Sequence, residues 1–310
     1  RLNHLQMSKG EDIMTTTMEN SKELEDNYYG VKMLSVSSVK KFLQNPARAL
    51  DDWNGVFPWF SKSTEQALIY GNYVHSAIQD ALENTDVHLK EFAEAHPSLY
   101  KKDGTLYAKY SEADSVAKIY INSKPFQDLL KYINEPNKEL YVERAFQSSW
   151  KGVAYKGKLD VMIVDTKLKK VHCIDFKTSR PYPASGIDWY DTYTGERTKG
   201  QIIWDVTKLY PVQAGVYRNL LLQNGYEGYN IEYSYIVITK ESTPRIDVWK
   251  ISDEAMEKGF DIFKAALVDA DTYINDETVV VPVIDDDSVW AKRRTWEKPN
   301  ILTVDNEDND

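Results

Sequence analysis

Apolar side chains recur at helical spacing through the first third of the chain. In LSVSSVKKFLQNPARALDDW, residues 34–53, Ser37 or Ser38 can cap a helix that continues through Leu43, and Pro46 marks its end. Further helices are predicted at residues 63–83, around 111–123 and at 125–133. One face of the first of these carries Leu68, Gly71, Val74, Ile78 and Leu82.

Beyond residue 139 the pattern changes to that of β-strands. Runs rich in β-branched and aromatic residues predict strands at 140–150, 153–165 and 169–179. A helix that ends at Gly225 follows, and then come strands at 229–240 and 244–252 and a last helix at 253–274. This order predicts one α/β domain, a central mixed β-sheet flanked by helices, with helical additions at the N-terminus.

Polar and acidic segments predict the limits of this domain. Residues 1–30 are polar, lack the apolar core of a signal peptide and are predicted to be disordered. A single domain is predicted at residues 31–280. Residues 281–310 contain DDD and end in DNEDND, which predicts an acidic, mobile C-terminal tail.

Composition excludes several classes of protein. The 310 residues carry a net charge of −10, which disfavours non-specific coating of nucleic acid but permits a local site where a metal ion bridges acids to a phosphate. No apolar run is long enough for a membrane span, so no membrane contact is expected. Cys173 is the lone cysteine, which excludes an intramolecular disulfide framework and fits a cytoplasmic location.

Acidic and basic residues interrupt two of the apolar strands. Asp175 and Lys177 share one face of the strand HCIDFKTS, because side chains alternate along a strand. If residues 166–169 close a symmetric hairpin, Asp165 faces Lys170 and Asp160 lies opposite Asp175, with Cβ atoms about 5 Å apart. Two carboxylates at that separation repel each other, and a divalent cation such as Mg²⁺ or Mn²⁺ would relieve the repulsion.

Two predicted helices add candidates for the same site. His75 shares a helix face with Gly71, whose lack of a side chain would allow a ligand or another backbone to approach. Gln213 and Tyr217 are also spaced four apart. Each residue has a plainer explanation. The histidine could be a buried residue bonded to a neighbour, and the other two could be a surface glutamine and a packing tyrosine.

Taken together, these segments resemble the PD-(D/E)XK nuclease superfamily, in its RecB-like and phage exonuclease VIII-like branch. The matching segments are GNYVH (71–75), GKLD (157–160), IDFKTS (174–179) and QAGVY (213–217), and LSVSSVKKFLQNPA resembles the N-terminal segment of the phage-type domains. Asp175 stands where many relatives carry Glu. Four-cysteine iron–sulfur relatives and helicase fusions are excluded, because the cysteines and a phosphate-binding G-x-x-x-x-G-K-[ST] loop are missing.

The resemblance implies a restriction-endonuclease-like core and a role for each matched residue. Asp160, Asp175, His75 and the backbone carbonyl of Phe176 would bind the metal. Lys177 would orient or activate water and stabilise charge on the phosphate. The resemblance implies that Gln213 and Tyr217 position the lysine or the phosphate. Glu143, the acid in YVERAF, has a less certain role.

The implied activity is a Mg²⁺- or Mn²⁺-dependent deoxyribonuclease, an exonuclease acting on ends of linear double-stranded DNA in phage-type recombination. The resemblance also implies a homo-oligomer, a single-strand annealing protein as partner, and the cytoplasm of a bacterium or phage-infected host. The alternatives are a structure-specific endonuclease or repair-complex nuclease of the same fold, and a non-catalytic DNA-end-binding module. An acidic calcium-binding protein is disfavoured, because no EF-hand loop is present.

The segment 180–200 is a second candidate for DNA contact. Its basic groups could hold phosphates and its aromatic rings could stack on bases. The candidates are Arg180, Trp189, Tyr193, Arg197 and Lys199, with Tyr182 and Tyr190 beside them. An ordinary surface loop is an equal alternative, because Asp188, Asp191 and Glu196 dilute the positive charge.

Overall fold

The computed structural model of the chain describes residues 24–60, 62–179, 189–190, 197–198, 209–284 and 290–291. The helices are α2 (Val36–Gln44), α3 (Pro46–Trp53), α4 (Lys62–Glu83), α5 (Val87–Ala95), α6 (Ala108–Ile121), α7 (Lys124–Ile133), α8 (Tyr210–Leu222) and α9 (Asp253–Asn275), with a 3-10 turn at Pro97–Leu99. The strands are β1 (Leu34–Ser35), β2 (Lys138–Trp150), β3 (Val153–Asp165), β4 (Lys170–Ser179), β5 (Trp189–Tyr190), β6 (Arg197–Thr198), β7 (Asn230–Thr239) and β8 (Ile246–Ile251).

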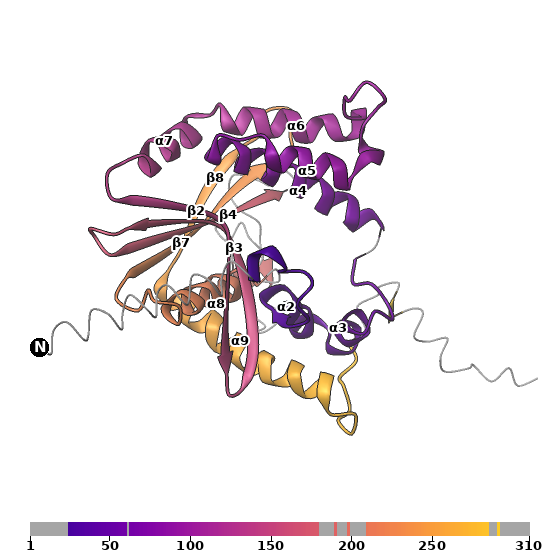
Figure 1. The fold of residues 1–310 in the computed structure, drawn as a ribbon. Coiled ribbons are helices and arrows are strands. Elements are labelled where there is room, and N and C mark those ends of the chain that lie inside the picture. The colour runs from indigo at the N-terminus through magenta and orange to yellow at the C-terminus, as the bar shows by residue number, and fades with distance from the viewer. Residues whose placement is uncertain are drawn as a thin grey trace, which may run out of the picture.

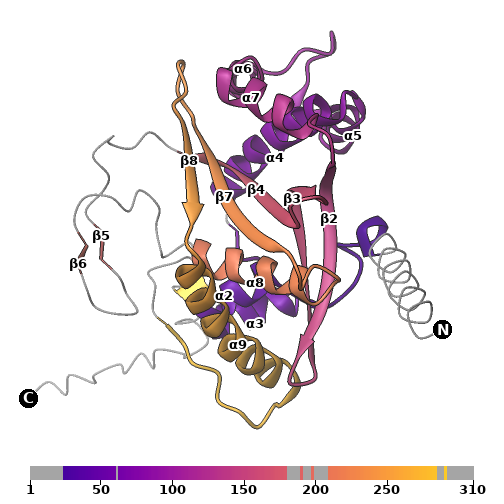
Figure 2. The ribbon, with the colours of Figure 1, turned by 90° about the vertical axis from the view of Figure 1, so that its left-hand side faces the viewer.

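A mixed sheet forms the centre of the fold (Figures 1 and 2). Strands β2, β3 and β4 are antiparallel neighbours, β7 runs parallel to β4, and β8 closes the far edge antiparallel to β7. The parallel step from β4 to β7 requires a crossover connection, and α8 lies within it. The short β1 pairs in parallel with the start of β3. This sheet confirms the predicted α/β class.

Helices cover both faces of the sheet, and the strand alternation sorts the core into two clusters. In Figure 1, α4 to α7 lie on one side of the sheet and α2, α3, α8 and α9 on the other. Ile174 packs with the α4–α7 layer, whereas its neighbour Cys173 packs with the α8–α9 layer. The close crossing of α8 and α9 depends on Gly215, because a Cβ there would lie 2.1 Å from the Met256 carbonyl oxygen.

Most predicted elements agree with the structure, and the main exceptions are local. The five long strands and the last helix agree within two residues at each end. The predicted cap at Ser37 or Ser38 is wrong, because Ser35 caps α2 and Ser38 completes a reciprocal capping box with it. Pro46 follows α2 but also opens α3, which the sequence analysis missed together with α5.

Both predicted ends of the domain need correction. Disorder through residue 30 is wrong for residues 24–30: Leu24 is buried, and the Glu25 carboxylate accepts hydrogen bonds from the Ala145 N–H at 3.0 Å and from Arg144 at 3.2 Å. Residues 281–284 are not a free tail, because the Pro282 carbonyl accepts from the Ala47 N–H. Trp290 is buried and donates to Asp51 at 2.6 Å. Residues 1–23, 285–289 and 292–310 lie outside the described residues.

Among the described residues, none of the helices combines the length and the apolar character needed to cross a bilayer.

Candidate metal centre and cleft

The strand pairing is interrupted where Glu143 and Asp160 face each other. The β2–β3 ladder pairs Val142 with Val161 and Arg144 with Leu159 but skips the two acids between them. Glu143 has a φ of 53°, a left-handed conformation that costs a non-glycine residue on the order of 1–3 kcal/mol. Glu143 and Asp160 are therefore not paired with each other in the β2–β3 ladder.

The interruption also exchanges the faces of β3. Leu159 packs with the α8–α9 layer, whereas Val161, two residues further on, packs with the α4–α7 layer. An uninterrupted strand would place these two side chains on the same face. Asp160 lies at the point of exchange.

His75 on α4 is held by the backbone of Phe176. Its Nε2 lies 2.7 Å from the Phe176 carbonyl oxygen, and because a carbonyl can only accept, Nε2 carries the proton. In the neutral imidazole, Nδ1 therefore offers a lone pair, and it lies 3.5 Å from Oδ2 of Asp160. The same oxygen accepts the Phe176 N–H at 2.9 Å. One peptide segment thus orients both the histidine and the aspartate.

These residues form a group that could hold a metal ion. One ligand atom each of His75, Glu143 and Asp160 lies within 4.8 Å of the others. One imidazole nitrogen and two carboxylate oxygens suit Mg²⁺ or Mn²⁺. Burial, followed by the charge of Asp175, raises the pKa of Asp160 to about 7, so the protein alone does not balance the negative charge here. The donor set and the excess charge both fit a divalent cation.

Asp175 lies beside this group but is held by other partners. The β3–β4 register pairs Asp165 with Lys170, as the hairpin argument predicted, although the ladder ends at Val161 and Ile174, one pair before Asp160 and Asp175. Asp175 is 2% exposed, forms an ion pair with Lys177 and accepts from Tyr233 at 3.3 Å. The described part of the chain therefore groups Glu143, rather than Asp175, with His75 and Asp160.

Lys177 keeps its positive charge in this setting. Burial alone would lower the pKa of its ammonium, but the carboxylates of Asp175 and Asp160 raise that pKa above its ordinary value. The Nζ atom also lies 6.0 Å from the Tyr210 ring centre and 5.8 Å from that of Tyr235. In this state Lys177 can donate hydrogen bonds but cannot accept a proton.

Helix α8 supplies Gln213 and Tyr217, one turn apart. The Gln213 amide donates to Oδ1 of Asp175 at 2.5 Å and accepts from Lys40 at 3.1 Å. The Tyr217 ring lies so close to Gly157 that a Cβ on Gly157 would be 2.5 Å from it. Gln213 thus positions Asp175, and the glycine of the GKLD segment makes room for the tyrosine.

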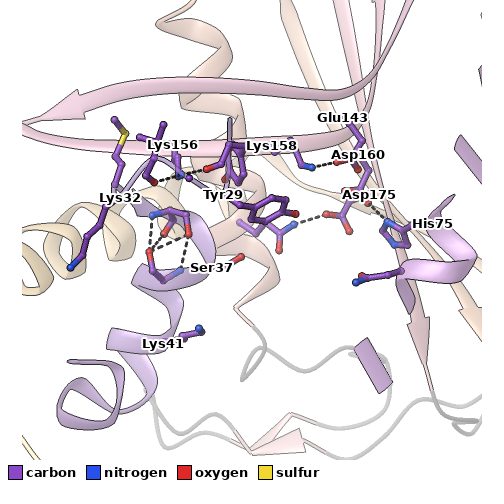
Figure 3. Close-up of a pocket in the computed structure, with 18 of the residues that line it drawn as sticks. Tyr29, Lys32, Ser37, Lys41, His75, Glu143, Lys156, Lys158, Asp160 and Asp175 are labelled. Atoms are coloured by element: carbon purple, nitrogen blue, oxygen red, sulfur yellow. Dashed lines mark hydrogen bonds and ion pairs between the residues drawn. The ribbon is translucent and has the colours of Figure 1, made fainter. Parts of the chain in front are cut away.

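The grouped ligands, the Asp175–Lys177 pair and the two α8 side chains border one cleft of about 1070 Å³. Figure 3 shows Glu143, Asp160, Asp175 and His75 gathered at one side of it. The remaining wall is partly basic and was missed by the sequence analysis. Its lysines are Lys32, Lys41, Lys156 and Lys158. The alternation in YKGKLD could have indicated two of them, because residues two apart share a strand face.

Comparison with known families decides the identity of the fold. The family described as "PDDEXK-like domain of unknown function (DUF3799)" matches residues 35–279. The chain belongs to this family. The match confirms both the superfamily and the α/β core that the sequence motifs predicted.

Solved structures add a similarity of fold. The crystal structure named "Putative exonuclease", from Eubacterium rectale, is 18% identical with a TM-score of 0.64, covering 86% of this chain and 91% of its own. The structure of SSO0001 is 17% identical with a TM-score of 0.29, covering 64% of this chain and 85% of its own, and carries no argument about fold. No curated protein matches the chain.

The PDDEXK-like domain brings the predicted core residues together, but the candidate DNA loop lies mostly outside the described residues. Seven of the predicted side chains border the cleft: His75, Glu143, Asp160, Asp175, Lys177, Gln213 and Tyr217. The Phe176 carbonyl, a predicted metal ligand, accepts from His75. Arg180, Tyr182, Tyr193 and Lys199 lie outside the described residues. Only the backbones of Trp189, Tyr190 and Arg197 are described, in the two-stranded ribbon of β5 and β6.

Proposed function

We propose that this PDDEXK-like domain is a metal-dependent nuclease that hydrolyses phosphodiester bonds of DNA. The observation that carries the proposal is the cluster of His75, Glu143 and Asp160 beside the ion pair of Asp175 and Lys177, in one cleft. A nitrogen and oxygen donor set can hold the ion that activates water, and a protonated lysine beside it can stabilise the charge that develops on a phosphate.

The residues of the cleft would have different roles in this reaction. His75, Glu143 and Asp160 would hold Mg²⁺ or Mn²⁺, and Asp175 is near enough to raise the pKa of Asp160 and could join them. The ion, when bound, would lower the pKa of a bound water and stabilise the charge that develops on the phosphate. Lys177 would donate a hydrogen bond to a phosphate oxygen, and Gln213 would keep Asp175 in place.

The finer proposal is an exonuclease that digests linear double-stranded DNA from its ends in phage-type recombination. It is supported by the exonuclease VIII-like motifs and by the name of the Eubacterium rectale relative in fold. With the motifs come the further proposals of a homo-oligomer and of a single-strand annealing protein as partner. Sedimentation analysis tests the first, and co-purification with such a protein tests the second.

Timed digestion of DNA tests the activity itself. Linear duplex, the same DNA as a closed circle, and end-labelled duplex are incubated with Mg²⁺, with Mn²⁺ and with EDTA. We expect progressive loss of the linear DNA from its ends, resistance of the circle, and no digestion in EDTA. Digestion of the circle as fast as the linear form would favour an endonuclease. Binding without cleavage would favour a non-catalytic DNA-end-binding module.

The matched variants for this assay are Asp160→Asn and Asp165→Asn. Both replace an aspartate of β3, but Asp165 pairs with Lys138 at the far end of the strand, outside the cleft. We expect loss of cleavage in Asp160→Asn alone. A folded Asp160→Asn protein with the activity of the unaltered protein would overturn the proposal.

A further inference from the structure

The cleft contains two lysine–carboxylate pairs with different positions relative to the metal group. Lys177 pairs with Asp175, which is not part of the group of three. Lys158 pairs with Glu143, which is part of it. In the metal-free protein, the ammonium of Lys158 therefore neutralises a carboxylate that a divalent cation would need.

The geometry allows this pair to separate without moving the strands. The backbone of Lys158 is paired with Ala145 in the β2–β3 ladder, so its starting point is fixed. Its side chain is 22% exposed and borders the cleft. The Nζ atom lies 5.1 Å from the Tyr29 ring centre and 5.6 Å from that of Tyr28, so the ammonium keeps aromatic contacts when it leaves Glu143.

We infer that Lys158 competes with the divalent cation for Glu143 and, once displaced, donates to a phosphate of the nucleic-acid backbone in the cleft. The inference rests on the proposed function. A cation bound by Glu143 and Asp160 cancels the charge that attracts Lys158, and a partly buried ammonium that has lost its partner favours a new anion. A backbone phosphate beside the metal provides that anion. Metal and DNA therefore bind with positive coupling through this lysine.

The first arm of the test measures metal affinity without DNA. Mn²⁺ is titrated calorimetrically into the full chain and into Lys158→Met, Lys158→Arg and Lys170→Met. Lys170 is the matched control, because it pairs with Glu232 at 2.9 Å, is similarly exposed and does not border the cleft. We expect tighter Mn²⁺ binding, by about fivefold or more, only in Lys158→Met. Unchanged or weaker binding in a folded Lys158→Met protein would overturn the inference.

The second arm separates release of Lys158 from simple loss of repulsion. The affinity for a fluorescent linear duplex is measured by anisotropy in EDTA for the unaltered protein, Glu143→Gln, Lys158→Met and the double variant. Glu143→Gln frees the lysine without metal, so we expect stronger DNA binding that disappears in the double variant. If the gain persists in the double variant, it comes from the lost negative charge, and the inference fails.

The third arm measures the coupling directly, with Ca²⁺ in place of EDTA. We expect the ion to strengthen DNA binding by the unaltered protein more than by Lys158→Met. Equal strengthening would contradict the coupling. If the unaltered protein binds no divalent cation, the proposed function itself fails. If it binds and cleaves but the Lys158 variants behave like Lys170→Met, only the inference fails.

Discussion

The side-chain amide of Gln213 donates a hydrogen bond of 2.5 Å to Oδ1 of Asp175, joining α8 to the strand that it covers. The two residues are 38 positions apart in the chain and both are buried. A buried carboxylate is stable only where its oxygens have partners, and here Gln213 supplies one, Lys177 supplies another, and Tyr233 adds a weaker bond. This bond makes Gln213 a positioning residue.

We therefore expect Gln213→Leu to lower the free energy of unfolding by roughly 1.5–3 kcal/mol, because a buried bond to a charged acceptor is lost. Metal affinity should change little, because Gln213 is not among the three grouped ligands. Asn219→Ala, on the same helix as Gln213, is the matched control: it removes the hydrogen bond of 2.8 Å that the Tyr155 hydroxyl of β3 donates to the uncharged Asn219 amide oxygen. Denaturant titration measures both, and a larger loss in Asn219→Ala would contradict the role of Gln213.

The raised pKa of Asp160 predicts a pH dependence of stability in the metal-free protein. The folded state holds its proton up to about pH 7, whereas the unfolded chain releases it near the ordinary value of 3.8. Between these values the folded state binds more protons, so stability falls as pH rises, by up to about 1.4 kcal/mol per pH unit from this group. Asp160→Asn should remove this pH dependence of stability, while the amide oxygen of the new asparagine still accepts the Phe176 N–H.

Denaturant titrations of both proteins in EDTA, between pH 5 and 8, measure the difference. We expect Asp160→Asn to be the more stable protein at pH 8 and to lose that advantage toward pH 5. Mn²⁺ should stabilise only the unaltered protein. Parallel pH curves for the two proteins would show that Asp160 carries no unfavourable charge.

Lys177→Met should separate metal binding from cleavage. The substitution removes the donor intended for the phosphate but none of the three grouped ligands. We expect Mn²⁺ to bind at least as tightly as in the unaltered protein, because a nearby positive charge is gone, while cleavage is lost. Calorimetry and the digestion assay provide the two readouts. Cleavage retained in Lys177→Met would remove this residue from the proposed reaction.

Two glycines of the motifs should respond oppositely to alanine. Among the described residues, a Cβ on Gly71 would meet only Thr178 Oγ1, at 3.5 Å, so Gly71→Ala should stabilise α4 by about 1 kcal/mol. A Cβ on Gly157 would lie 2.5 Å from Tyr217, so Gly157→Ala should destabilise by about 1–3 kcal/mol. Thermal unfolding measures both changes.

Cleavage by Gly71→Ala then tests the sequence-based expectation that this glycine allows a ligand or another backbone to approach. Among the described residues, the contact at Gly71 is an ordinary one, and none of their backbones approaches it closely. If a nucleic acid approaches there, cleavage should fall although stability rises. Unchanged cleavage would show that a ligand does not need the space.

Local patterns were sufficient to predict the strands and to single out several residues that border the cleft. The alternation of polar and apolar residues is a property of neighbouring positions, and the register of a hairpin depends on its turn, so Asp165 was correctly placed opposite Lys170. The shared face of Cys173 and Asp175 follows from the same period. The sequence also contained the superfamily motifs, since each lies within one helix or strand.

Only the tertiary structure decided which side chains meet. His75 and the Phe176 carbonyl are 101 residues apart, and no local period relates them. The faces of β3 exchange at Asp160, opposite the left-handed backbone of Glu143, which regular alternation cannot predict. Glu143 rather than Asp175 thus joins His75 and Asp160, and Lys158 reaches Glu143, because packing between distant segments overrides the ideal strand at this point.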